Sequence, residues 1–348
     1  MLRFAILQTA FIGDVALSLP LPQAIRNNAH SARITFVTTP AAASLLSCAA
    51  AVDEVLIFDK RGKHSGLNGL SKFAAELRKR NFDYILSPHR SVRSALLARL
   101  SQSETSVGFS AAAWAFLYDK RVEYRTSYHE TMRILSLLEA VEEIKHPLNA
   151  PEVVIEIPAS DIEHSEILWR QTGIDDTEKV VAVAPGSVWA TKRWPKQYFA
   201  HAVRIIRQKG CRAIIIGSKE DAELCEETAT ETNSVSLAGK TTLPQTLHIL
   251  RRCNVALTND SAPAHLARLV NTPSVTIFGP TMPQFGFAAS GEYDRVIENT
   301  RLACRPCTIH GSKKCPTGTF ECMTSLEPQM AADAVFQILE TISGDNKI

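Results

Sequence analysis

The stretch VVAVAPGSVWATKRWPKQYFAHAVRIIRQKG, residues 180–210, decides the fold. It opens with five apolar residues, rich in valine, that have the length of a buried strand. A polar loop follows, and then Phe199, Val203 and Ile206 recur at the spacing of one helix face, with Gly210 as the stop signal. A strand, a loop and an amphipathic helix in this order are typical of a parallel sheet covered by helices.

The same alternation of strands and helices occurs in both halves of the chain. The predicted strands of the first half span residues 4–8, 33–38, 54–58 and 83–87, and those of the second half span 180–184, 213–216, 235–238, 255–258 and 274–278. We therefore predict an α/β protein with two domains of similar size, each built on a parallel sheet, and a cleft between them. Because ligands of such sheets bind beyond the carboxyl ends of the strands, we expect the site in the loops that follow them.

The domain boundary is predicted from a segment without helical periodicity. Residues 147–161 contain three prolines and read as a linker. We accordingly place an N-terminal domain at 1–160 and a C-terminal domain at 161–327. Residues 328–348 are predicted to form a closing helix that packs back across the two domains.

The net charge of +2 argues against a nucleic-acid binder that acts through bulk charge. The charge is unevenly distributed, because the stretch from Lys60 to Arg99 carries ten Lys or Arg residues against two acids, Glu76 and Asp83. This stretch is either a solvated helix face or a basic patch that faces an anionic acceptor or a membrane surface.

The first fourteen residues, MLRFAILQTAFIGD, superficially resemble a signal peptide. Gln8 interrupts the apolar run and Asp14 closes it, so we predict a buried first strand instead. Cys48, Cys211, Cys225 and Cys253 are scattered through predicted strands and helices, which fits a reducing compartment. We expect a cytoplasmic protein.

Two loops of the second half are suited to bind a pyrophosphate. In the loop of residues 185–195, Ser187 and Thr191 offer hydroxyl donors, and Lys192 and Arg193 place two cations before the next helix. An ordinary strand-to-helix loop with surface charges could have the same sequence pattern. This loop alone therefore does not decide between a pyrophosphate-binding loop and an ordinary one.

The loop Thr258-Asn259-Asp260-Ser261-Ala262-Pro263-Ala264-His265 is the second candidate. Asp260 or Ser261 is expected to cap the helix that follows, while the small residues Ser261 and Ala262 leave backbone amides open to a phosphate. His265 projects one turn later. The sequence Asn-Asp-Ser is also simply a good helix cap, but two anion-ready helix starts in one domain favour a nucleotide diphosphate.

Other phosphate-binding motifs are absent from the sequence. Neither half has GxGxxG after a strand or GxxxxGK[ST], which disfavours a dinucleotide-dependent dehydrogenase and a P-loop phosphotransferase. Glu220 and Asp221 place carboxylates where a ribose could bind, although helix starts are often acidic.

Four motifs together resemble one enzyme family. They are Gly13-Asp14, Thr191-Lys192-Arg193-Trp194-Pro195, Asn259-Asp260-Ser261-x3-His265 and Phe278-Gly279-Pro280-Thr281. In this order, over about residues 1–340, the chain resembles the ADP-heptose–lipopolysaccharide heptosyltransferases of glycosyltransferase family 9. The resemblance implies a GT-B fold, in which two Rossmann-like domains with parallel sheets face a central cleft. The donor would bind the C-terminal domain and the acceptor the N-terminal domain, with no metal or other cofactor required.

The resemblance also implies two catalytic residues. Asp14 would accept the proton of the acceptor hydroxyl, and Lys192 would neutralise the leaving phosphate. A sugar hydroxyl is a poor nucleophile and needs such a base, which agrees with a carboxylate after the first strand. Asp14 could instead be a plain helix cap.

The remaining implied residues hold the donor. Ser187 and Thr191 would assist Lys192 at the phosphates, and Glu220 or Asp221 would hold the ribose. Asp260 would contact the heptose hydroxyls, the amides of Ser261 and Ala262 would contact the phosphates, and His265 would stand beside them. Pro263 departs from the family, in which many members carry Gly and an apolar residue at 262–263, and this weakens the assignment of Ala262.

Four further cysteines crowd into the tail as Cys304-x2-Cys307-x7-Cys315-x6-Cys322, with His310 among them. Such a set is compatible with tetrahedral zinc, although the second pair lacks the short spacing of zinc ribbons. A disulfide and an ordered loop without metal remain alternatives.

We predict an inverting glycosyltransferase that moves heptose from ADP-heptose to the anionic lipopolysaccharide inner core, with addition of the second heptose to the first as the favoured step. It would act in the cytoplasm, in peripheral contact with the inner membrane, and without nucleic acid. The alternatives are a nucleotide-sugar epimerase on the same architecture and a metal- or redox-sensing binding protein that uses the tail cysteines.

Overall fold

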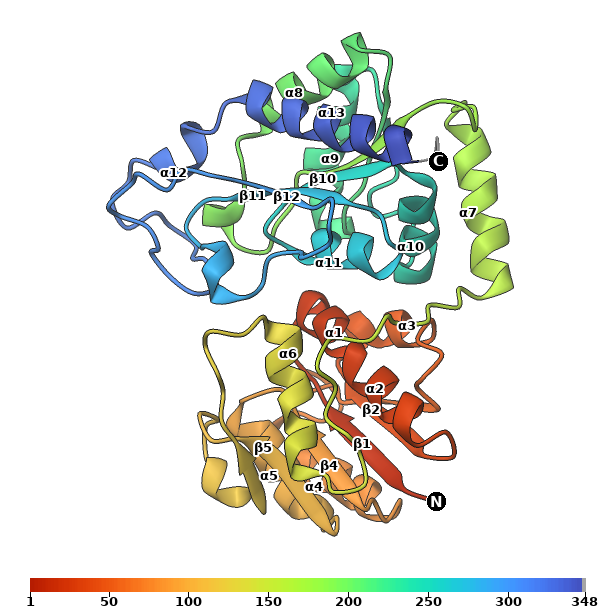
Figure 1. Cartoon of the computed structure of the whole chain (residues 1–348), viewed down its shortest axis with the longest axis vertical. Coiled ribbons are helices and arrows are strands. Elements are labelled where there is room, and N and C mark those ends of the chain that lie inside the picture. The colour runs from red at the N-terminus through yellow and green to blue at the C-terminus, as the bar shows by residue number, and fades with distance from the viewer. Residues whose placement is uncertain (346–348) are drawn as a thin grey trace. The chain divides into compact units, whose positions relative to one another are not determined.

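The computed structural model describes residues 1–345, without the side chains of 344 and 345. The chain divides into two compact units, Met1–Glu156 and Ile157–Ile348. Figure 1 shows the first unit in red to yellow and the second in green to blue. Each unit is described by itself.

The first unit is built on a parallel six-stranded sheet in the order β3-β2-β1-β4-β5-β6. Its strands are β1 (Arg3–Leu7), β2 (Arg33–Thr38), β3 (Glu54–Ile57), β4 (Tyr84–Ser87), β5 (Thr105–Phe109) and β6 (Lys120–Val122). Its helices are α1 (Ile12–Ser18), α2 (Pro20–Asn28), α3 (Ala43–Leu46), α4 (Gly66–Arg78), α5 (Val92–Ser101) and α6 (Glu130–Leu135), with 3-10 turns η1 (Pro40–Ala42), η2 (Ala115–Leu117) and η3 (Ser136–Ala140). The central strand β1 is apolar because it is buried on both faces.

The second unit repeats this plan in the order β12-β11-β10-β7-β8-β9. Its strands are β7 (Val180–Ala184), β8 (Arg212–Ile215), β9 (Val235–Ser236), β10 (Val255–Asn259), β11 (Ser274–Phe278) and β12 (Arg295–Glu298). Its helices are α7 (Ala159–Gln171), α8 (Lys196–Gln208), α9 (Ala222–Thr232), α10 (Leu243–Arg252), α11 (Ala262–Leu269), α12 (Glu321–Thr324) and α13 (Pro328–Asp345), with 3-10 turns η4 (Ala190–Lys192), η5 (Lys219–Asp221) and η6 (Pro283–Phe285). The helix face of Phe199, Val203 and Ile206 is fully buried in the core of this unit, as its spacing predicts.

The strand order of the two sheets is the same, and it is the Rossmann order. The chain runs outward from β1 to β3, returns to the centre and continues from β4 to β6; the second sheet does so from β7 to β9 and from β10 to β12. The order therefore reverses between β1 and β4 and between β7 and β10, where ligands of such sheets bind. The predicted α/β class with two Rossmann-like, parallel-sheet domains is confirmed, and the central cleft stays a prediction.

The structure adds elements that the sequence pattern does not show. Strands β5, β6 and β12 and helix α5 lie outside the predicted elements. The segment expected to be a linker is partly structured, because Ile155 pairs with Ala49 and α7 begins at Ala159.

Helix α13 packs against α8 of the second unit (Figure 1). The predicted packing of this helix across both domains stays a prediction, and its last three residues, 346–348, lie outside the described residues. No helix within residues 1–345 is long and apolar enough to cross a bilayer.

Candidate functional site

The two predicted donor loops lie side by side at the point where the second sheet reverses its order. Thr258 of β10 is the register partner of Ala184 of β7, so the loops that follow these two strands are neighbours. Asn259 joins them: its side-chain amide donates to the carbonyls of Pro185 (2.8 Å) and Gly186 (3.3 Å), and its Oδ1 accepts the N–H of Trp194 (3.0 Å). Asn259 is fully buried, so it fixes the 185–195 loop at both ends.

The loops bring Lys192 and Asp260 together as an ion pair. Lys192 Nζ lies 2.6 Å from Asp260 Oδ2, and their side chains are only 13% and 7% exposed. The hydroxyl of Thr281 also donates to Asp260 Oδ2, at 2.7 Å. A cation that can meet a phosphate and a carboxylate that can accept sugar hydroxyls therefore stand in contact.

The start of α11 differs from the sequence prediction in its cap. No side chain caps this helix. The carboxylate of Asp260 is held by Lys192 and Thr281 instead, and the hydroxyl of Ser261 donates to the carbonyl of Asn259 at 3.3 Å. Ser261, one of the two predicted candidates, therefore occupies the N-cap position, but its side chain does not form the predicted capping hydrogen bond with an amide of the first turn.

Ala262, Pro263 and His265 lie in the first turn and a half of α11, where their sequence order puts them. Pro263 is compatible with that position because its missing N–H would have no helical partner there. The roles of Ser261, Ala262 and His265 at the phosphates stay predictions.

The loop after β8 closes against the loop after β7. A Cβ atom on Gly186 would lie 2.4 Å from the carboxylate of Asp221, so any larger residue at 186 would require the Asp221 side chain to move. Asp221 Oδ2 accepts from the backbone N–H and the hydroxyl of Ser218, at 3.2 and 2.7 Å. Glu220 is exposed, and its own backbone N–H and Ser218 lower the pKa of its carboxyl. The ribose role of Glu220 or Asp221 stays a prediction.

Ser187 and Thr191 are buried in this loop. The carbonyl of Ser187 accepts from Arg193 Nε at 2.7 Å. Thr191 exchanges hydrogen bonds with Ser312: its N–H donates to the Ser312 carbonyl (3.1 Å), and its hydroxyl accepts the Ser312 N–H (2.8 Å). The structure therefore shows Thr191 in contact with the tail segment that contains the cysteines.

Arg305 is a site-supporting residue that the sequence interpretation missed. Its guanidinium, 5% exposed, donates to the carbonyls of Gly279 and Thr281 and forms an ion pair with Glu298 at 2.8 Å. It thus holds the loop whose Thr281 binds Asp260. Its place between the two cysteines of the Cys-x2-Cys pair marks the segment in the sequence, but no local pattern points to this contact with Gly279 and Thr281.

We predict that Arg305→Ala lowers the free energy of unfolding by about 2–4 kcal/mol, because Glu298, which is 16% exposed, loses its cation and the carbonyls of Gly279 and Thr281 lose their donor. Urea denaturation measures this change. Arg301→Ala, which removes an exposed arginine of the same segment, is the matched control and should change stability by less than about 0.5 kcal/mol. Equal stability of the two variants would contradict the conclusion that Arg305 holds the loop of Gly279 and Thr281 in place.

The tail cysteines are free thiols: Cys304, Cys307 and Cys315 lie in an irregular segment, and Cys322 is buried in α12. Within residues 1–345, no group of three His, Cys, Asp or Glu side chains is arranged to hold a metal ion. A hydrogen bond with the Thr317 hydroxyl, with further backbone N–H groups, lowers the pKa of Cys315 to about 7, whereas burial raises the pKa of Cys322 to about 11.

Asp14 lies at the corresponding place in the first sheet. It is the third residue of α1, directly after β1, and its Oδ2 accepts the backbone N–H of Phe11 at 3.1 Å. This hydrogen bond supports the interpretation that Asp14 caps α1. The position, where the strand order reverses, is also the one expected of a residue that meets a substrate.

Cations gather around the carboxyl ends of the neighbouring strands. Lys60, after β3, donates to the carbonyl of Thr9 at 2.6 Å, and burial, with Arg93 and Arg61 nearby, lowers the pKa of its ammonium. His89, after β4, has its Nδ1 2.9 Å from the Thr9 hydroxyl, and burial with the charges of Lys60 and Arg90 lowers its pKa to about 4. His89 is therefore neutral near pH 7, and the fixed positive charge comes from Lys60, Arg90 and Arg93.

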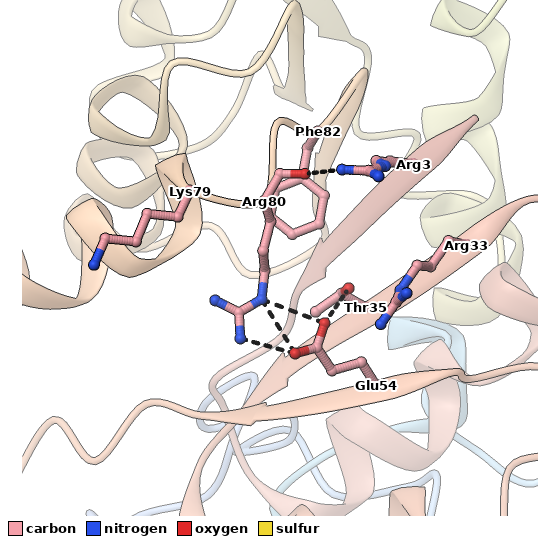
Figure 2. A pocket seen from close by; sticks show the side chains of 7 residues that line it. All are labelled: Arg3, Arg33, Thr35, Glu54, Lys79, Arg80 and Phe82. Atoms are coloured by element: carbon pink, nitrogen blue, oxygen red, sulfur yellow. Dashed lines mark hydrogen bonds and ion pairs between the residues drawn. The ribbon is translucent and has the colours of Figure 1, made fainter. Parts of the chain in front are cut away.

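The basic stretch 60–99 does not form one patch. Arg80 lies in a pocket of about 350 Å³ at the amino ends of the strands, where it pairs with Glu54 at 2.8 Å (Figure 2). Glu54 also accepts from Thr35. Chain direction explains the division, because α4 runs from the carboxyl edge of the sheet back to its amino edge.

Residues 70–317 match the sequence profile of glycosyltransferase family 9 (heptosyltransferase). The chain belongs to this family. The match spans more than half of the chain, and the lipooligosaccharide heptosyltransferase 2 of Haemophilus influenzae is 27% identical over 202 residues, 56% of each chain. The aligned part thus spans about half the length of that relative. Membership confirms the resemblance drawn from the motifs.

Solved structures of family members have the same fold. A family 9 glycosyltransferase from Veillonella parvula superimposes with a TM-score of 0.86 at 21% identity, covering 97% of both chains. The ADP-heptose lipopolysaccharide heptosyltransferase II of Escherichia coli superimposes with a TM-score of 0.78 at 21% identity, covering 99% of this chain and 100% of the other. The two Rossmann-like domains of the predicted GT-B fold are confirmed.

Proposed function

We propose that this family 9 enzyme transfers heptose from ADP-heptose to the lipopolysaccharide inner core, with inversion and with addition of the second heptose to the first as its step. The observation that supports it most is the Lys192–Asp260 pair beside the uncapped start of α11. Relatives named heptosyltransferase 2 support the choice of sugar and acceptor. We place the enzyme on the cytoplasmic face of the inner membrane, and no metal or other cofactor is required in this proposal.

In the proposed reaction the acceptor hydroxyl attacks the anomeric carbon of the donor heptose from the face opposite to the phosphate. Asp14 accepts the hydroxyl proton as the new C–O bond forms. The bond from the anomeric carbon to the phosphate oxygen breaks, and ADP leaves. Lys192 and the amides at the start of α11 stabilise its negative charge, which is how these residues can act without a metal ion.

Mass spectrometry of products tests the proposal. The protein is mixed with ADP-heptose and with core lipids that end either before or after the first heptose. We expect one heptose to be added only to the lipid that already carries the first. Conversion of ADP-heptose without any acceptor would establish the epimerase instead, and stoichiometric zinc without donor binding would establish a metal-binding protein. No contact within residues 1–345 favours either alternative.

The cations at the carboxyl edge of the first sheet predict an acceptor effect. Arg90→Glu combined with Arg93→Glu should raise the acceptor KM about tenfold at low salt and less at high salt, because the core carries negative charges. Donor affinity should stay unchanged. Lys72→Glu with Lys79→Glu, the same charge change on α4 and just after it, is the control. Equal KM values for the two double variants would show that these arginines form a solvated surface.

A further inference from the structure

An apolar connection is displayed on the surface of the first unit. Between β5 and β6, residues 110–117 read Ser-Ala-Ala-Ala-Trp-Ala-Phe-Leu and contain no charge. Trp114 is 49% exposed and Phe116 is 71% exposed, with their ring centroids 6.3 Å apart. Surface connections are ordinarily polar, and an exposed apolar patch with large aromatic side chains marks a surface that another body covers.

Backbone hydrogen bonds fix the conformation of residues 110–117. Trp114 adopts a left-handed conformation, with φ of 58°, which is uncommon for a bulky residue. The N–H of Ala113 donates to the carbonyl of Arg90 at 3.1 Å, and the N–H of Leu117 donates to the carbonyl of Trp114 at 3.0 Å. Just beyond it, the buried Tyr118 hydroxyl donates to Ser87 at 2.9 Å. The two aromatic rings are thus exposed on a loop that is anchored at both ends.

Unpaired cations flank the loop. Arg90, whose carbonyl anchors Ala113, has its guanidinium 3.9 Å above the ring of Tyr124. Arg93 is exposed in the first turn of α5, the helix on which η2 packs. Neither arginine forms an ion pair with a carboxylate of the described part of the chain. The surface therefore combines apolar aromatic side chains with positive charge.

We infer that residues 110–117 insert their aromatic side chains into an anionic lipid bilayer, with Arg90 and Arg93 at the lipid headgroups. Trp and Phe beside cations are the side chains that interfacial membrane contacts use. Eight residues are too few for a stable contact with a second copy, which takes about 20–30 residues on each side. The inference deepens the proposed function, since a lipid-linked acceptor lies in such a bilayer.

Vesicle binding by the full-length protein, without donor or acceptor, tests the inference. We expect co-sedimentation with vesicles of phosphatidylcholine mixed with phosphatidylglycerol and a blue shift of tryptophan emission. Trp169 and Trp194 are almost fully buried, whereas Trp189 is partly exposed, so the part of the shift that the Trp114 variant below loses is the part that reports on Trp114. Trp114→Ser with Phe116→Ser should weaken partition at least about tenfold. Ile167→Ser with Met330→Ser, two exposed side chains of the second unit, should leave it unchanged.

Equal partition of the two double variants, or parent emission that does not move with anionic vesicles, would overturn the inference. So would self-association that depends on Trp114 and Phe116 in the absence of vesicle binding, because the surface would then meet a second copy. A melting temperature within the range of the control variant shows that the loop variant is folded. If the protein binds vesicles but transfers heptose to none of the acceptors, the proposed function is wrong and the inferred membrane contact is still supported.

Discussion

Asp14→Asn should lower heptosyl transfer at least about a hundredfold, because general-base catalysis contributes roughly 10²–10⁴ in rate. The amide keeps the shape of the carboxylate and can still accept the N–H of Phe11, the contact that caps α1. It has lost the basic oxygen that takes the proton of the acceptor hydroxyl. Initial rates at saturating donor and acceptor measure the effect.

Melting temperature and donor affinity, measured on the same preparation, separate this role from a structural one. A helix cap contributes only about 1 kcal/mol, so a capping Asp14 would give a slightly less stable enzyme with turnover largely intact. Asp175→Asn is the matched control, since this exposed carboxylate accepts from Thr177 in a turn of the second unit. An Asp14→Asn enzyme with more than a tenth of the parental turnover would rule out the proposed mechanism.

The central strands of both sheets could be predicted because they are buried on both faces and therefore carry continuous apolar runs. Val180–Ala184 and Ser274–Phe278 match the predicted bounds. The missed strands β6 and β12 lie at sheet edges, are three and four residues long, and carry charged residues. An edge strand needs only one partner and tolerates polar side chains, so its sequence resembles that of a loop.

The site could be predicted as far as local sequence determines it. The order of strands and loops placed Lys192 and Asp260 in loops that follow two strands, but nothing in the sequence pattern shows that β10 lies next to β7. That adjacency brings the two residues into contact and gives Asn259 its carbonyl partners in the neighbouring loop. Local sequence also could not show that Asp260 makes no capping hydrogen bond to α11, because a tertiary ion pair competes with local capping for its carboxylate.

Arg305 shows the same limit more strongly. Its partners Gly279 and Thr281 lie 26 and 24 residues away in sequence, on a loop after another strand. Local pattern marks the cysteines around Arg305 and gives no sign that the arginine is the buried member of the segment. Only the packing in three dimensions shows whether an arginine is buried and hydrogen-bonded to a distant loop or is exposed to solvent.

Lys192→Ala should weaken ADP binding about ten- to a hundredfold. A charge-assisted contact with a phosphate contributes about 1.5–3 kcal/mol, and each 1.4 kcal/mol is tenfold in affinity. Isothermal titration with ADP measures this directly, without the heptose hydroxyls that Asp260 is proposed to hold. Unchanged affinity would exclude Lys192 from the donor site.

The contact between Lys192 and Asp260 requires a second variant, because removing the lysine also leaves a nearly buried carboxylate without its cation. That change alone should lower the free energy of unfolding by about 1–3 kcal/mol and could disturb the loop. Lys192→Ala with Asp260→Asn removes both charges, so the double-mutant cycle separates the two effects. If Lys192 meets the phosphate, the double variant regains stability and still binds ADP weakly. If Lys192 serves only to neutralise Asp260, the double variant regains both stability and ADP affinity, and the leaving-group role proposed for Lys192 is wrong.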